Sequence, residues 1–267
     1  MNVNAIKKLK SKLASGESVY GMWITMEAPA VSMIGAAMGL DWLVVEGEHG
    51  HLDMAELSEH VRSAVRSDTV VLTRISELNR GLIKKALDIG VDGVIVPFIE
   101  KPEQLLKAVS YAHYPPHGVR GVGGEMATAW GQCISQHVSE AGEYTLVIPL
   151  LESVGVLENI DALCDVPGVD IFFFGPNDYS ASAGYAGQWE GPGVAAQILE
   201  IKDTILRRGK YCGLLATNEE TLLTRKQQGF QMLGIAVDTG LIIGGLKEQL
   251  RVAGREASLS TDLHPSP

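Results

Sequence analysis

The sequence has few cysteines and no long apolar run, and each absence excludes a class of protein. Cys133, Cys164 and Cys212 are far apart in the 267 residues, so they indicate neither a disulfide framework nor the paired spacing of a zinc site. No stretch reaches the roughly 18 consecutive apolar residues of a membrane span. The first residues do not have the pattern of a secretory signal. We therefore expect a cytoplasmic protein with no membrane partner.

Positive charge is also scarce. The chain has 22 Lys and Arg residues against 32 Asp and Glu residues, which gives a formal net charge of −10. Its one short basic stretch, residues 7–12, is typical of the solvated face of a first helix. We therefore expect no nucleic-acid partner, because such partners select basic surfaces.

Short apolar runs alternate with segments of helical periodicity along most of the chain. The runs predict strands near residues 19–25, 42–46, 70–75, 93–98, 145–151, 169–174, 211–216 and 231–237. The helical segments are 29–38, 54–66, 79–89, 102–113, 154–164, 194–208, 219–228 and 239–251. Eight such pairs predict an α/β protein with a (β/α)₈ barrel. A doubly wound open sheet is disfavoured because no G-x-G-x-x-G follows the first strand.

The chain shows no internal domain boundary. We expect one barrel domain over residues 1–257 and a disordered tail over 258–267, which is polar and contains two prolines. Two connections, 114–144 and 178–193, are too long for plain turns. Long connections of this kind usually serve as functional loops or subunit contacts.

Two carboxylates follow neighbouring predicted strands. Glu152 comes directly after 145–151, and Asp178 follows 169–174 through a Gly-Pro-Asn turn. Reacting groups of such barrels lie at the carboxyl ends of the strands, where these two acids would meet. An all-oxygen pair without His or Cys favours Mg²⁺ or Mn²⁺. Alternatively, each acid caps the helix that follows it, and the residues alone leave both interpretations open.

Three further polar residues end predicted strands. His49 stands between two glycines, where it is either a general base oriented by Glu46 or Glu48 or an ordinary surface histidine. Arg74 ends a buried run, where a guanidinium needs an anionic partner. That partner is either a substrate carboxylate or enolate, or a structural ion pair with one of the two glutamates.

Several of these residues belong to motifs that occur in a recognisable order. The motifs are Gly21-Met22-Trp23, residues 41–49, Arg74, residues 87–97, residues 114–121, Glu152 and residues 175–178. Over about residues 15–250 the chain resembles the class II pyruvate-dependent aldolases of the HpcH/HpaI type. The resemblance implies a barrel of the phosphoenolpyruvate/pyruvate superfamily type. It also implies a homo-oligomer, trimer or hexamer, in which the last helix packs on a neighbouring subunit.

The resemblance also implies a reaction and a metal. A 4-hydroxy-2-oxo acid would be cleaved reversibly to pyruvate and an aldehyde through a metal-stabilised pyruvate enolate. The metal, Mg²⁺ or Mn²⁺ with Co²⁺ or Zn²⁺ as alternatives, would be held by Glu152 and Asp178. The substrate would contact Arg74 and the turn formed by Gly175, Pro176, Asn177 and Asp178.

The same resemblance assigns catalytic roles. Arg74 would stabilise the enolate, and His49 would transfer protons with Glu46 beside it. Asp88 of an adjacent subunit would pair with His49. Oxaloacetate decarboxylation, acyl-coenzyme A cleavage and non-catalytic binding of a 2-oxo acid remain alternatives.

Four residues depart from the family pattern. Glu46 stands where the family has aspartate, Leu150 where it often has glutamine, Thr128 near a usual arginine, and Tyr179 where leucine is usual. These departures leave the enolate chemistry in place and bear on the aldehyde side. We expect Leu150 and Tyr179, beside the two metal ligands, to determine specificity.

Overall fold

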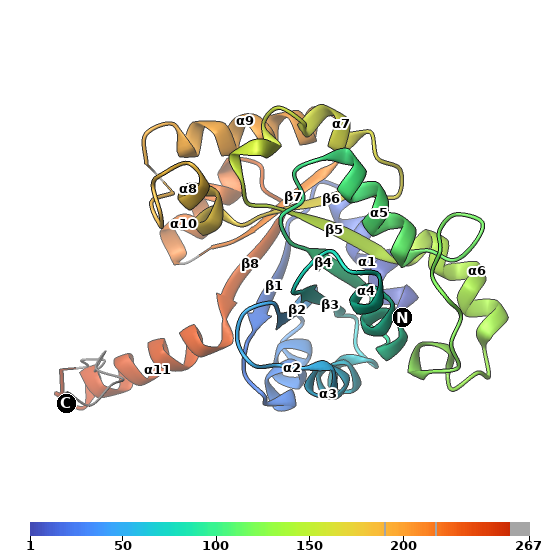
Figure 1. Cartoon of the computed structure of the whole chain (residues 1–267). Helices are drawn as coiled ribbons and strands as arrows, with labels where there is room; N and C mark the ends of the chain where they lie inside the picture. Colours follow the sequence, from blue (N-terminus) through green and yellow to red (C-terminus); the bar gives the residue numbers. More distant parts are fainter. Residues whose placement is uncertain (190, 217, 257–267) are drawn as a thin grey trace, which may run out of the picture.

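Eight parallel strands form a closed barrel in the computed structural model, which describes residues 1–256 except 190 and 217 (Figure 1). Each strand pairs with the next along the chain, and β8 pairs with β1 to complete the ring. The strands are β1 (Val19–Ile24), β2 (Trp42–Gly47), β3 (Val70–Ile75), β4 (Gly93–Val96), β5 (Leu146–Leu151), β6 (Ile171–Phe174), β7 (Tyr211–Leu215) and β8 (Met232–Val237). The predicted (β/α)₈ barrel is therefore confirmed.

Helices connect the strands and surround the barrel. They are α1 (Val3–Ala14), α2 (Pro29–Ala37), α3 (Met54–Ala64), α4 (Arg80–Ile89), α5 (Pro102–Ala112), α6 (Ile134–Tyr144), α7 (Ile160–Cys164), α8 (Pro176–Ser182), α9 (Val194–Arg207), α10 (Glu219–Gln227) and α11 (Asp238–Val252). Two 3₁₀ turns, η1 (Met126–Thr128) and η2 (Val154–Val156), complete the set. The predicted helix 154–164 is therefore a 3₁₀ turn followed by a short α-helix.

Both long connections contain helices that the sequence did not predict. The first includes α6, an amphipathic helix whose buried residues are His137 and Ala141. The second begins with α8, whose seven residues are too few to show a period. The expected disordered tail lies outside the described residues.

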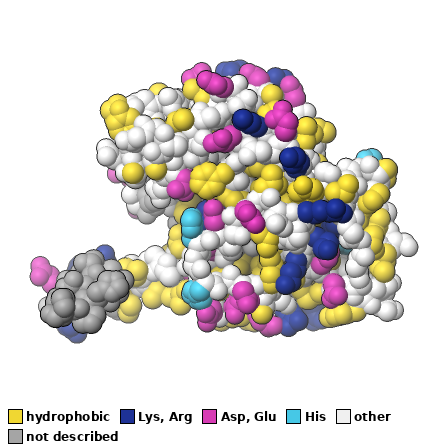
Figure 2. Space-filling model, viewed as in Figure 1, with side chains coloured by type: hydrophobic (Ala, Val, Ile, Leu, Met, Phe, Trp, Pro, Cys, Tyr) yellow, Lys and Arg dark blue, Asp and Glu magenta, His cyan; other side chains and the backbone are white. Residues whose placement is uncertain are grey.

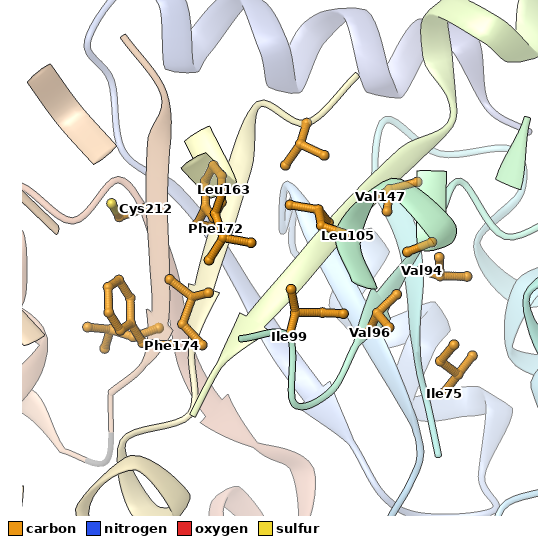
Figure 3. Close-up of a cluster of buried hydrophobic side chains, with 14 of the residues drawn as sticks. Ile75, Val94, Val96, Ile99, Leu105, Val147, Leu163, Phe172, Phe174 and Cys212 are labelled. Carbon is orange, nitrogen blue, oxygen red and sulfur yellow. The ribbon is translucent and has the colours of Figure 1, made fainter. Parts of the chain in front are cut away.

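Strand side chains alternate between two apolar layers. Trp42 and Val44 of β2 face the barrel interior together with the buried face of α1, which closes the amino-terminal end. Outward side chains such as Phe172 and Phe174 of β6 belong to a second buried apolar cluster, which also includes Leu105 of α5 and Leu163 of α7 (Figure 3). Because direction alternates with every residue, an inward residue at the last position of a strand lies in the barrel mouth.

Helix α11 leaves the barrel and projects away from the body (Figure 1). Its side chains Leu241, Ile242 and Leu246 are 56%, 47% and 59% exposed, and hydrophobic side chains are visible where it leaves the body (Figure 2). An apolar groove of about 520 Å³ lies beside its base, lined by α2 and by the first turns of α11. Exposed apolar surface of this extent is typical of a protein interface. No helix in the described part of the chain is long and apolar enough to cross a bilayer.

Candidate active site

A cavity of about 460 Å³ opens at the carboxyl ends of the strands. Its polar lining residues are Thr25, Glu46, His49, Arg74, Glu152, Asn177 and Asp178. Its other lining residues are Trp23, Gly50, Leu150, Phe173, Phe174, Gly175, Pro176, Leu215 and Val237. The cavity thus brings together all the residues predicted to bind metal or substrate and, except for Asp88, those predicted to be catalytic.

Strand alternation places the main polar side chains in this cavity. On β5, Leu146, Ile148 and Leu150 face the barrel interior, so the next inward position is Glu152. Glu46 of β2 and Arg74 of β3 are direct partners in the sheet register. These three polar residues therefore form the top inward layer of the barrel, above the apolar layers.

Glu46 is the most highly connected of these side chains. Its Oε1 accepts hydrogen bonds from the backbone N–H groups of Glu48 (2.7 Å) and His49 (2.8 Å). Its Oε2 accepts from Trp23 Nε1 at 2.6 Å and from Arg74 Nε at 2.8 Å. Burial alone would raise the pKa of Glu46, but Arg74, with the hydrogen bonds from His49 and Trp23, holds it below its usual value. Glu46 therefore orients the His49 loop through its backbone rather than through the imidazole.

Arg74 is held between two carboxylates. Its Nη2 lies 2.7 Å from Glu46 Oε2, and its Nη1 lies 2.9 Å from Glu48 Oε2. The guanidinium carbon also lies 5.6 Å from the centre of the Trp23 ring. The ion-pair interpretation of Arg74 is confirmed, and the side chain still lines the cavity. It is thus fixed in place where an anionic ligand can reach it.

Glu152 is buried with one oxygen unpaired. Its Oε1 accepts a hydrogen bond of 2.8 Å from Phe98 N–H, whose residue has a left-handed φ of 50°. Its Oε2 has no hydrogen-bond partner among the described residues. A Cβ on Gly175 would lie 2.7 Å from that oxygen, so glycine leaves the room it occupies. Burial, with the neighbouring charges of Glu48 and Asp178, raises the pKa of Glu152 to about 7.

The capping interpretation of Glu152 is wrong, and among the described residues no side-chain hydrogen bond caps the start of α8. Glu152 binds Phe98 N–H, while Ser153 is the residue that caps the following 3₁₀ turn. Asp178 lies in the first turn of α8, but its carboxylate makes no hydrogen bond with the described backbone there. Both carboxylates are therefore available to a ligand in the cavity.

The donor set fits a hard divalent cation. Four carboxylates lie in or beside the cavity, those of Glu46, Glu48, Glu152 and Asp178, whereas Arg74 is the one Lys or Arg side chain among the described lining residues. Burial raises the pKa of Glu48 despite the opposing charge of Arg74. No group of three or more His, Cys, Asp or Glu side chains among the described residues is arranged to hold a metal alone. Substrate and water would therefore complete the coordination of a cation at Glu152 and Asp178.

Three residues lie outside the cavity of this chain. Asp88, near the end of α4, accepts a hydrogen bond of 2.8 Å from the buried Arg120. Thr128 donates to backbone carbonyls of its own loop. Tyr179 is fully buried, and its hydroxyl donates to Gln197 at 3.1 Å. The expectation that Tyr179 determines specificity is therefore wrong, because α8 turns this side chain into the core.

The structure also adds two residues to which sequence reasoning gave no role. Trp23 fixes Glu46, and Phe98 supplies the N–H group that binds Glu152. Trp23 occupies an inward position near the end of β1, and the alternation of side chains along that strand could have identified it. The role of Phe98 depends on its left-handed backbone, which the sequence does not signal.

The fold and site define a class of enzyme, a barrel with a carboxylate-rich site at its carboxyl end. The HpcH/HpaI aldolase/citrate lyase model matches residues 19–244. The chain therefore belongs to this family, whose aldolases are carbon–carbon lyases, as the sequence predicted.

Individual relatives cover nearly the whole chain. A hydroxypyruvate/pyruvate aldolase of Pseudomonas aeruginosa is 32% identical, over 94% of this chain and 92% of its own. A 2-keto-3-deoxy-L-rhamnonate aldolase of Salmonella gallinarum is also 32% identical, over 98% of both chains. The crystal structure of a family member from Burkholderia cenocepacia aligns with a TM-score of 0.88 at 25% identity, covering 92% of this chain and 99% of that one.

The raised pKa of Glu152 predicts a pH-dependent cost to folding. The pKa of Glu152 is about 7 in the folded protein and 4.5 ordinarily. Below about pH 4.5 the carboxyl group is neutral in both states, so its burial carries no electrostatic cost and the folded state is at its most stable with respect to this group. As the pH rises from 4.5 through 7, the free energy of unfolding falls, because the unfolded state loses its proton first. Between pH 5 and 8, Glu152→Gln should therefore gain on the order of 2 to 3 kcal/mol over the metal-free wild type.

Urea unfolding in excess chelator at pH 5 and pH 8 measures this gain. Glu158→Gln, which removes the same charge from an exposed position, is the matched control. A stability difference between Glu152→Gln and the wild type that is equal at both pH values would contradict the prediction.

Proposed function

We propose that the chain catalyses the reversible cleavage of a 4-hydroxy-2-oxo acid to pyruvate and an aldehyde, with a divalent cation bound by Glu152 and Asp178. The observation that carries this proposal is the buried Glu152 carboxylate with an unpaired oxygen, in the same cavity as a clamped Arg74. Membership of an aldolase family supports the same reaction.

Each side chain of the cavity has a role that follows from its position. Arg74 faces the cavity already oriented by Glu46 and Glu48, so it stabilises negative charge on a substrate oxygen without reorganising. His49 is exposed in the cavity mouth on a loop that Glu46 fixes, and an imidazole can both accept and donate a proton near neutral pH. The Gly175–Asp178 turn borders the same space, where a substrate carboxylate would lie.

The cation's contribution is Lewis acidity. When bound, it would polarise the keto group of the substrate and so lower the cost of placing negative charge on that oxygen. The oxygen-only donors favour Mg²⁺ or Mn²⁺ over Zn²⁺ or Co²⁺.

Metal removal should abolish proton exchange at the methyl group of pyruvate. In D₂O, chelator-treated protein should show no enzymatic exchange by proton NMR, and Mg²⁺ or Mn²⁺ should restore it. Glu152→Ala should lower the restored rate at least about 100-fold, since it removes a proposed metal ligand, whereas Glu158→Gln should leave it unchanged.

The pattern of results separates the alternatives. Exchange that is insensitive to both chelator and Glu152→Ala would reject the proposal. Metal-dependent turnover of oxaloacetate or a thioester, without cleavage of 4-hydroxy-2-oxo acids, would favour the decarboxylase or acyl-coenzyme A lyase. Binding of a 2-oxo acid without any exchange would indicate a non-catalytic barrel.

We further propose a homo-oligomer, trimer or hexamer, in which α11 packs on a neighbouring copy. The exposed face of α11 and the groove beside α2 are both apolar, so the helix of one copy could pack into the groove of another. Both surfaces lie on the same side of the barrel. Asp88 lies outside the cavity of its own chain, and one of its carboxylate oxygens accepts a hydrogen bond from Arg120. We propose that this carboxylate pairs with His49 of the neighbouring copy.

Charged substitutions on α11 should therefore dissociate the oligomer. A Leu241→Glu, Leu246→Glu double variant places two carboxylates in the proposed interface, where burial without partners is unfavourable. Light scattering coupled to size exclusion should show a smaller species than the wild type. Gln249→Glu, an exposed polar position of the same helix, is the control, and a monomeric wild type would contradict the assembly.

A further inference from the structure

The inner side of the cavity is apolar. Five side chains form it, and we call them the apolar wall: Trp23, Leu150, Phe173, Leu215 and Val237. Leu150 and Phe173 are 2% and 1% exposed, and the rings of Trp23 and Phe173 are 5.4 Å apart. The wall is therefore the top of the packed barrel interior rather than a flexible surface.

Polar groups close to the wall already have partners. Trp23 Nε1 donates to Glu46 at 2.6 Å. The hydroxyl of Thr25 donates to Asp238 at 2.8 Å. Among the described lining residues, no other side chain of the wall has a polar atom. A ligand hydroxyl directed at the wall would therefore lose water without gaining a strong partner.

Leu150 is the wall residue directly below Glu152. It precedes Glu152 by two positions on the same inward face of β5, which places it about 6 to 7 Å deeper along the strand. A 2-oxo acid held between Glu152 and Arg74 therefore lies over Leu150. The cavity of about 460 Å³ falls in the range that holds drug-sized ligands, so a three-carbon acid does not fill it.

We propose that the apolar wall is a subsite for a short alkyl substituent on the carbon next to the keto group of the 2-oxo acid. The chain then selects 2-oxobutanoate over hydroxypyruvate as the donor of the new carbon–carbon bond. This inference rests on the proposed function and deepens it. It distinguishes the chain from its relative named for hydroxypyruvate, whose substrate carries a hydroxyl on that carbon.

The half-reaction that tests the subsite needs no aldehyde. A C–H bond next to the keto group breaks, its proton passes to a base in the cavity, and its electron pair moves toward the keto oxygen. A deuteron from D₂O then returns to the same carbon. Rates of exchange for pyruvate, 2-oxobutanoate and hydroxypyruvate, corrected for the uncatalysed reaction, give the three kcat/KM values.

With Mg²⁺ present, kcat/KM for 2-oxobutanoate should exceed that for hydroxypyruvate at least about 10-fold, as expected for one unpaired buried hydroxyl. Leu150→Gln places an amide under the substrate and should lower this ratio at least about 10-fold. Leu150→Met, which keeps the wall apolar, is the matched control and should leave the ratio within about threefold. Calorimetric dissociation constants of the two acids should follow the same order, which gives a readout independent of turnover.

A second variant covers the case in which Leu150→Gln does not fold. Val237→Thr keeps the shape of its side chain and adds a hydroxyl to the wall, so it should also lower the ratio. If the wild type exchanges pyruvate but prefers hydroxypyruvate, or if the variant that folds leaves the ratio unchanged, the subsite is rejected and the proposed function stands. If no 2-oxo acid is exchanged or bound in the presence of metal, both are rejected.

Discussion

The carboxylate of Glu46 connects the parts of this site. It is 2% exposed, and it accepts hydrogen bonds from the Trp23 indole, the Arg74 guanidinium and the backbone of the His49 loop. A buried charge is tolerated only when such partners satisfy it. Because each partner comes from a different strand or loop, the one carboxylate fixes the relative positions of the His49 loop, the Arg74 guanidinium and the Trp23 ring. A shorter or neutral side chain would leave some of these groups without a partner.

The opposite behaviour of Glu46 and Glu152 follows from the same arrangement. Both carboxylates are buried in one layer, but Arg74 pairs with Glu46, so the pKa of Glu46 is lowered and that of Glu152 is raised to about 7. One guanidinium cannot neutralise the surrounding acids. The chain therefore keeps an electrostatically unfavourable carboxylate in its core, which is the usual sign of a site shaped for a ligand rather than for stability.

Much of the site could be predicted because it follows the period of the strands. Arg74 occupies the last inward position of β3, Glu152 occupies the next inward position after the end of β5, and that pattern is visible in sequence. The prediction for Tyr179 is wrong because adjacent residues of a helix point about 100° apart. Asp178 faces the cavity, so the next residue of α8, Tyr179, points into the core. The Phe98 N–H group binds a carboxylate 54 residues away, and α6 packs against α1, so neither feature has a local signal in the sequence. Asp88 pairs with Arg120 within its own chain, so the pairing with His49 that we propose for it would need a second copy of the chain.

The closed barrel also limits how specificity can change. Its interior must be packed with apolar side chains to be stable, and the uppermost of these, Leu150 and Phe173, form the inner side of the cavity. The same atoms therefore contribute to folding and line the cavity. A polar substitution there that admits a hydroxylated substrate also places a polar group against the core. A hydroxylated substrate would need a local polar partner for its hydroxyl group, and the one polar atom among the described side chains of the apolar wall, Trp23 Nε1, already donates to Glu46.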